Sequence, residues 1–127
     1  MSADSRLRKS GSARCLNGGE TDLITQMVRG TVLEARVLHA LAQAMVEDMA
    51  DGGMGSVRFC SARRGERRFR QQIAEASFVD EDGIAVSATL NLDQNGDLFE
   101  LDLWKVDNSA LHRYPARESI NVGTSGR

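Results

Sequence analysis

The sequence has little cysteine, little proline and no long apolar run. Its 127 residues include only Cys15 and Cys60, too few for a disulfide framework. We therefore expect two free thiols in a reducing compartment and assign the protein to the cytoplasm. No stretch approaches the roughly 20 apolar residues that a membrane-spanning helix needs, and Met1 to Ser12 lacks the apolar centre of a secretion signal. We expect no contact with a membrane.

A strong charge of either sign is also absent. Sixteen Lys and Arg residues against 18 Asp and Glu residues give a formal net charge of −2. This balance provides no global attraction to nucleic acid or to a membrane surface, so an electrostatic partner must be recognised locally. The content of 41% hydrophobic and 27% charged residues is ordinary for a globular protein.

The two ends of the chain differ in composition from its middle. Residues 1–19 contain many Ser, Gly, Arg and Lys residues and few apolar ones, which predicts a disordered tail. Residues 116–127 follow the only proline, Pro115, and show no periodicity, which predicts a loose C-terminal tail. Residues 20–115 are expected to form a single α+β domain.

Helical spacing of apolar residues appears first. It is carried by Leu23, Ile24, Met27 and Val28, and Gly30 then offers a left-handed stop. Thr31 and Glu34 fit a capping box, and the apolar residues after them continue one helical face. Two short helices are therefore predicted on either side of Gly30.

Strand patterns follow from residue 45 onward. Residues 45–50 fit a helix or a strand, and we favour a strand because Asp51-Gly52-Gly53 is a strong hairpin turn before residues 56–60. Further strands are predicted at Phe69–Val79, Ile84–Leu92 and Leu98–Val106, with Phe99, Leu101 and Leu103 in the core. The expected fold is α+β, an antiparallel meander sheet of about five strands with the two short N-terminal helices packed on one face.

Two sequence motifs resemble a bacterial family of small proteins without an assigned function. They are Asp51-Gly52-Gly53-Met54-Gly55-Ser56 before a strand, and Glu100-Leu101-Asp102-Leu103-Trp104-Lys105-Val106-Asp107 followed by Leu111 and Pro115. The resemblance spans roughly residues 45–115. Similar small α+β proteins serve as immunity partners of secreted bacterial toxins, so the resemblance implies that class. It implies no catalytic residues.

No cofactor or metal site is predicted. The glycines at positions 52, 53 and 55 precede a strand and lack the lysine and helix of a phosphate loop, so a hairpin turn explains them. Asp93, Asn95 and Asp97 imitate the start of a calcium loop, but Leu98 stands where that loop requires glycine. Turn chemistry explains these residues as well.

A mixed acidic and aromatic face is predicted on the last long strand. Glu100, Asp102 and Trp104 alternate along it, and the binding site is expected to include the neighbouring Asp93, Asp97 and Asp107. Because the core lies on the opposite face, something must cover Trp104. The candidates are the chain's own segment around Leu111 and Tyr114, a second copy of the protein, or a foreign partner.

Arginines cluster between the strands predicted at residues 56–60 and 69–79. Arg63, Arg64, Arg67 and Arg68 form a possible nucleic-acid site, but no aromatic platform accompanies them. We therefore expect an exposed, irregular loop from Ala62 to Arg67 and regard a nucleic-acid partner as the weaker interpretation.

The favoured function is a non-catalytic protein-binding module that resembles a toxin-immunity protein. Its acidic and aromatic face would meet a basic toxin or a second copy of the chain, without a cofactor. One alternative is a small enzyme that uses Glu100 and Asp102 as paired carboxylates in a pocket beneath Trp104. The other is RNA binding through the arginine loop.

Overall fold

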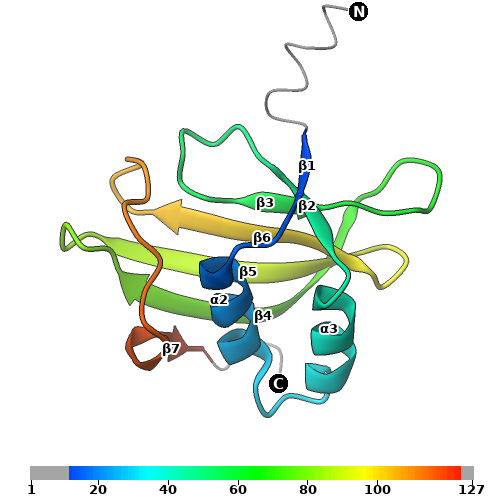
Figure 1. The fold of residues 1–127 in the computed structure, drawn as a ribbon, viewed down its shortest axis with the longest axis horizontal. Helices are drawn as coiled ribbons and strands as arrows, with labels where there is room; N and C mark the ends of the chain where they lie inside the picture. Colours follow the sequence, from blue (N-terminus) through cyan, green and yellow to red (C-terminus); the bar gives the residue numbers. More distant parts are fainter. Residues whose placement is uncertain (1–11, 124–127) are drawn as a thin grey trace, which may run out of the picture.

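One antiparallel sheet with helices on one side organises the chain (Figure 1). The computed structural model describes residues 12–123. Within this range the sheet has seven strands in the order β1-β2-β3-β6-β5-β4-β7. The strands are β1 (Ala13–Cys15), β2 (Met45–Asp48), β3 (Val57–Phe59), β4 (Phe69–Val79), β5 (Ala85–Asp93), β6 (Leu98–Lys105) and β7 (Asn121–Val122). The helices are α2 (Gly18–Val28) and α3 (Glu34–Leu41), with a 3-10 turn, η1 (Arg117–Ser119).

The expected count of about five strands is wrong, and the sheet is not a simple meander. The additional strands, β1 and β7, have three and two residues and form the two edges of the sheet. Strands this short carry no period-two signal in the sequence. In addition, β3 pairs with β6 instead of β4, so the central strand β6 lies between β5, which directly precedes it in the sequence, and the distant β3. The α+β class itself agrees with the structure.

Side-chain ion pairs hold β1 in place. The Arg14 guanidinium donates to both Glu20 carboxylate oxygens, at 3.0 and 2.7 Å, and also to Asp48 at 3.2 and 2.7 Å. Glu20 is buried and closes a capping box with Asn17 at the start of α2. These polar contacts order a segment whose composition alone predicts a tail. Residues 1–11 and 124–127, which also belong to the predicted tails, lie outside the described residues.

The two helices meet at Gly30, as predicted. Gly30 has φ +78°, a left-handed conformation that favours glycine. The capping box expected at Thr31 and Glu34 is absent. The Thr31 hydroxyl donates to the Val28 carbonyl, and the Glu34 carboxylate accepts from the Gly30 backbone, so both side chains stabilise the end of α2 instead.

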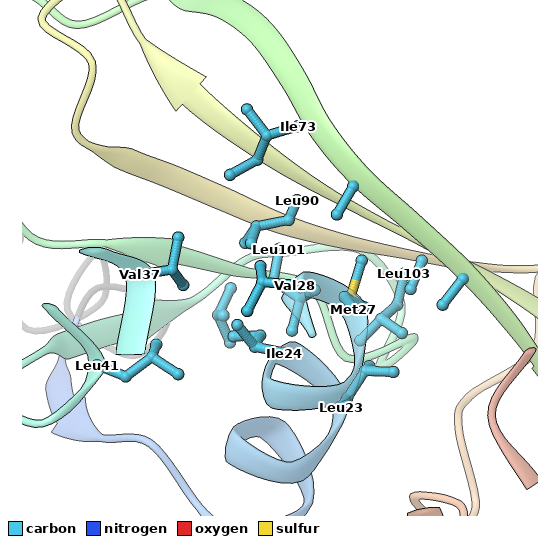
Figure 2. Packing of buried hydrophobic residues seen from close by; sticks show 14 of the residues in the cluster. Leu23, Ile24, Met27, Val28, Val37, Leu41, Ile73, Leu90, Leu101 and Leu103 are labelled. Carbon is cyan, nitrogen blue, oxygen red and sulfur yellow. The ribbon is translucent and has the colours of Figure 1, made fainter. Parts of the chain in front are cut away.

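The core lies between α2 and the sheet. Figure 2 shows Leu23, Ile24, Met27 and Val28 of α2 beside Leu90, Leu101 and Leu103 of the sheet, with Val37 and Leu41 of α3 at the side. Every one of these side chains is buried. Burial of such apolar area is the main contribution to the stability of a domain of this size.

The residues of the first motif fasten the β2–β3 hairpin to β6. The Asp51 carboxylate accepts from the backbone N–H groups of Met54 and Ser56. The Ser56 hydroxyl, in turn, bonds to the backbone N–H and carbonyl of Leu103. Gly55 has φ +105° and lies so close to Leu103 that a Cβ there would approach the leucine to 3.1 Å. The glycines therefore serve turn geometry, as predicted, and Gly55 also permits close packing against Leu103.

No helix among residues 12–123 has the length and apolarity needed to span a bilayer.

Candidate binding face

The sheet has an inner face against the helices and an outer face on the opposite side. On the outer face, the strand register places side chains in four successive rows. The rows are Glu47-Arg58-Glu100-Asn91-Gln72, then Asp102-Thr89-Glu75, then Trp104-Ser87-Ser77-Asn121, and finally Val106-Ala85-Val79. The face thus changes from charged at one end to apolar at the other.

Trp104 stands open on this face. Its side chain is 51% exposed, and its indole N–H donates to the Asn108 side chain at 2.9 Å. Leu111 and Tyr114, which were candidates to cover it, pack against the core cluster instead. Trp104 therefore remains half exposed.

Apolar side chains extend the exposed surface beyond Trp104. Val79 is 62% exposed and Val106 is 48% exposed, and Ala85 lies between them in the same row. Monomeric proteins rarely expose several large apolar side chains that are contiguous with one another. The end of the sheet around Trp104 is therefore an apolar patch on an otherwise polar face.

Two carboxylates in the next row form no ion pair among residues 12–123, although the charge of Arg58 acts on Asp102 from a greater distance. Asp102 accepts a 3.2 Å hydrogen bond from the Asn91 amide, and Glu75 accepts one from Gln72. Burial and the neighbouring Glu100 carboxylate raise the pKa of Asp102. A raised pKa means that the carboxylate lacks full compensation for its charge, and a cation brought to it would provide that compensation.

A hollow of about 340 Å³ lies beside these carboxylates. Its lining includes Ser77, Ser87 and Thr89, whose small side chains form the floor, and Glu75 at one side. Gly123 completes one wall, where a Cβ would come within 2.5 Å of the Glu75 side chain. Trp104 is the cross-strand neighbour of Ser87, and Asp102 is that of Thr89. The outer face therefore combines a hollow, an aromatic ring and two acids.

The other predicted acids do not join this surface as free charges. Asp93 is buried and pairs with Arg67 at 2.8 Å, Asp97 pairs with Arg63 at 2.6 Å, and Glu100 pairs with Arg58. Asp107 accepts from the hydroxyl and backbone N–H of Ser109. Most of the acidic hairpin charge seen in the sequence is thus neutralised within the domain.

The loop from Ala62 to Arg67 is irregular and exposed, as predicted, except at Arg67. The Arg67 side chain is 13% exposed and donates to Asp93 and to the carbonyls of Phe59 and Leu98. It therefore has a structural role. Arg64 and Arg68 are exposed, and neither makes an ion pair within the described residues.

Phe99 is buried, as predicted, but it lies outside the main core cluster. It lies at a register shift opposite Asn91 and Leu92, where β6 carries one additional residue. The Arg58 and Arg67 guanidinium groups lie 4.6 and 5.1 Å from the centre of its ring. These are cation–π distances, so Phe99 is held between two arginines.

A second polar cluster, which the sequence analysis missed, is centred on Lys105. Its ammonium group donates to Asp80 and Asp82, each at 2.7 Å, and to the Ala110 carbonyl at 3.0 Å. Asp80 also accepts from the backbone N–H groups of His112 and Arg113. Asp80, Asp82 and His112 have metal-ligand atoms within 4.8 Å of one another, but the Lys105 ammonium already bridges the two carboxylates.

One feature of the sequence indicated this cluster, namely a single lysine within a stretch that contains many acids. Lys105 is the only basic residue between Asp80 and Asp107. A single base in an acidic stretch is expected to form ion pairs. Successive residues of a strand point to opposite faces, so Lys105 lies on the inner face when Trp104 lies on the outer face.

Comparison with known proteins gives one match. The model of a family described as "Domain of unknown function (DUF6984)" matches residues 13–115. No curated protein matches, and no solved structure does. The matched range begins at β1 and ends after β6, so it includes the outer face from β1 to β6.

Proposed function

We propose, for a chain that belongs to the DUF6984 family, a non-catalytic protein-binding role in which the outer sheet face around Trp104 is the docking surface. The observation that carries this proposal is the open position of Trp104. A tryptophan that is 51% exposed beside Val79 and Val106 leaves an apolar patch in water. Large aromatic side chains in such patches are frequent anchors of protein interfaces.

The chemistry of the face favours a basic partner. The four rows contain the carboxylates of Glu47, Glu75, Glu100 and Asp102 and a single base, Arg58. A lysine or arginine from the partner would place its aliphatic stem against Trp104 and its charge near Asp102 and Glu75. The hollow, which Glu75 lines and whose Ser87 and Thr89 are the cross-strand neighbours of Trp104 and Asp102, has the space for one such side chain. Complementary charge would also accelerate association.

A toxin-immunity protein is one binding module of this kind. A cytoplasmic immunity protein neutralises its target by covering it and needs no catalytic group. A basic nuclease toxin would match the acidic outer face, and the sequence resemblance suggests the same class. A second copy of this chain would match less well, because a two-fold contact would bring the same unpaired acids together.

The two alternatives receive less support from the geometry. An acid–base pair needs both carboxylates free, but Arg58 binds Glu100 through both its Nε and a terminal nitrogen. RNA binding needs a continuous basic surface, but Arg63 and Arg67 pair with acids of the β5–β6 turn. Each site therefore loses part of the charge on which its hypothesis depends: Glu100 in the first, and Arg63 and Arg67 in the second.

The intrinsic fluorescence of Trp104 offers a direct test, because the sequence has no other tryptophan. A short peptide with arginine between apolar residues is titrated into the protein, and the same peptide with glutamate in place of arginine is the control. We expect the arginine peptide to change the emission of Trp104. The Asp102→Asn and Glu75→Gln variants should bind it more weakly, whereas Glu81→Gln, an exposed acid outside the four rows, should bind it like the wild type.

The opposite result would remove the outer face from consideration. It would consist of equal affinity for both peptides, or of peptide binding that the Asp102→Asn and Glu75→Gln variants leave unchanged. A partner identified later should likewise lose affinity for Trp104→Ala, and unaltered binding would count against the proposal.

A further inference from the structure

A separate pocket of about 490 Å³ lies on the helix side of the domain. It is formed by α3, by residues 59–63 after β3, and by the β5–β6 turn. None of the residues that form the four outer rows lines it. Its volume falls within the roughly 300–1,000 Å³ that is typical of small-molecule sites.

The walls of this pocket are largely apolar. Leu33 and Val37 contribute from α3, and Phe59, Leu92 and Leu98 contribute from the sheet. Ala40 and Ala44 also face it, and their short side chains leave space that larger residues would fill. The interior therefore suits a hydrocarbon group, which gains free energy when it leaves water.

The rim of the pocket carries one positive charge without an acidic partner among the described residues. Arg63 pairs with Asp97, so their charges cancel. Arg36 donates to the Gly96 carbonyl at 2.9 Å, a neutral acceptor, and makes no ion pair within residues 12–123. Its remaining N–H groups are available to an anion, for which the planar guanidinium is well suited.

We propose that this pocket binds a small amphipathic anion, with its apolar chain among Leu33, Val37 and Phe59 and its anionic group at Arg36. An acyl carboxylate is the simplest ligand of this class. The combination of an apolar interior and a single charge at the mouth selects for such a molecule over a fully polar one. The site is independent of the outer face, so either proposal can fail while the other stands.

Cys60 provides a local reporter of occupancy. It lines the pocket and is exposed, and Cys15 is an exposed thiol outside it. The rate at which a maleimide alkylates each thiol is measured by mass spectrometry of digested protein, with and without octanoate. We expect octanoate to slow the alkylation of Cys60 but not that of Cys15. Octylamine, which has the same chain and the opposite charge, should protect Cys60 much less.

Two variants test where the anionic ligand binds in the pocket. Arg36→Gln should weaken octanoate binding about tenfold, because it removes the charged donor. Ala40→Trp should abolish protection by filling the pocket, and Ala40 is exposed, so the helix can accept the change. Arg64→Gln removes an exposed arginine outside the pocket and should behave like the wild type.

Three results would overturn the proposal. They are the absence of selective protection of Cys60, equal protection by octanoate and octylamine, and unchanged protection in Arg36→Gln. Circular dichroism of each variant confirms that it is folded, and Arg36→Gln still decides the question if Ala40→Trp is not.

Discussion

Trp104 and Lys105 are consecutive residues of β6, yet they lie in opposite environments. Lys105 points inward, is fully buried, and bonds to Asp80, Asp82 and the Ala110 carbonyl. Trp104 points outward and is half exposed, and its indole N–H donates to the Asn108 side chain. The same strand therefore contributes to two surfaces with different roles.

This comparison distinguishes charged groups that stabilise the fold from charged groups that remain available to bind a partner. On the inner side, the polar groups of Asp80 and Lys105 find partners inside the domain, which is required when ions are buried. On the outer side, Asp102 and Glu75 find only amide partners. Asp80, directly after β4, and Asp102 of β6 can thus belong to different functions, and only Asp102, which forms no ion pair, is a candidate for binding.

The largest effect should come from breaking the inner cluster. Asp80→Ala leaves the buried Lys105 ammonium with an incomplete set of acceptors, and loss of one partner of a buried pair costs about 3–5 kcal/mol. Asp102→Ala should change the free energy of unfolding by less than about 0.5 kcal/mol, as is usual for surface substitutions. Urea denaturation of both variants measures the difference, and equal losses would contradict the division into two surfaces.

A similar contrast should separate two arginines of the same loop. Arg67→Ala removes hydrogen bonds to Asp93 and to two carbonyls, so a loss of roughly 2 kcal/mol in the free energy of unfolding is expected. Arg64→Ala removes an exposed side chain and should stay within about 0.5 kcal/mol of the wild type. If both substitutions prove neutral, Arg67 has no structural role.

The pKa values of Asp80 and Asp102 should be shifted in opposite directions from the ordinary value. Burial alone would raise the pKa of Asp80, but the Lys105 ammonium and three backbone N–H groups outweigh it and lower the pKa to about 2. The stability from Asp80 is therefore complete above its ordinary pKa of 3.8 and is lost as the pH falls toward about 2. The pKa of Asp102 is raised, chiefly by burial, so its protonation adds stability as the pH falls through that raised value.

Carbon-13 NMR of the side-chain carboxyl groups measures both values. We expect Asp102 to titrate above 3.8 and Asp80 well below it. In Asp80→Asn, the part of the acid-induced loss of stability that Asp80 causes should disappear. Coincident titration of the two residues would show that their environments do not differ as the structure indicates.

The long elements could be predicted from the sequence because their periodicity is local. The turns at Gly30 and at Asp51-Gly52-Gly53 and the strand at residues 45–48 follow from residue chemistry, as does the outward position of Trp104. The edge strand β1 could not be predicted, because it is ordered by the contacts of Arg14 with Glu20 and Asp48. Ion pairs between distant segments leave no periodic trace.

The features of the binding face that could not be predicted from the sequence also depend on contacts between distant segments. Alternation predicts the burial of Phe99 correctly, but it does not predict that a one-residue register shift places the ring between Arg58 and Arg67. The sequence also shows an acidic stretch without showing which of its charges are paired. Arg63 and Arg67 come from another loop, and only the fold brings them to Asp97 and Asp93.

The most direct test of the account compares stability and binding in one variant, Trp104→Ala. Because the ring is half exposed and outside the core cluster, the free energy of unfolding should change by less than about 1 kcal/mol. Affinity for the basic partner, or for the arginine peptide measured by calorimetry, should fall by about 2 kcal/mol or more, which is the usual loss for an interface anchor. A variant that is strongly destabilised, or one that binds as tightly as the wild type, would contradict the assignment of this face to binding.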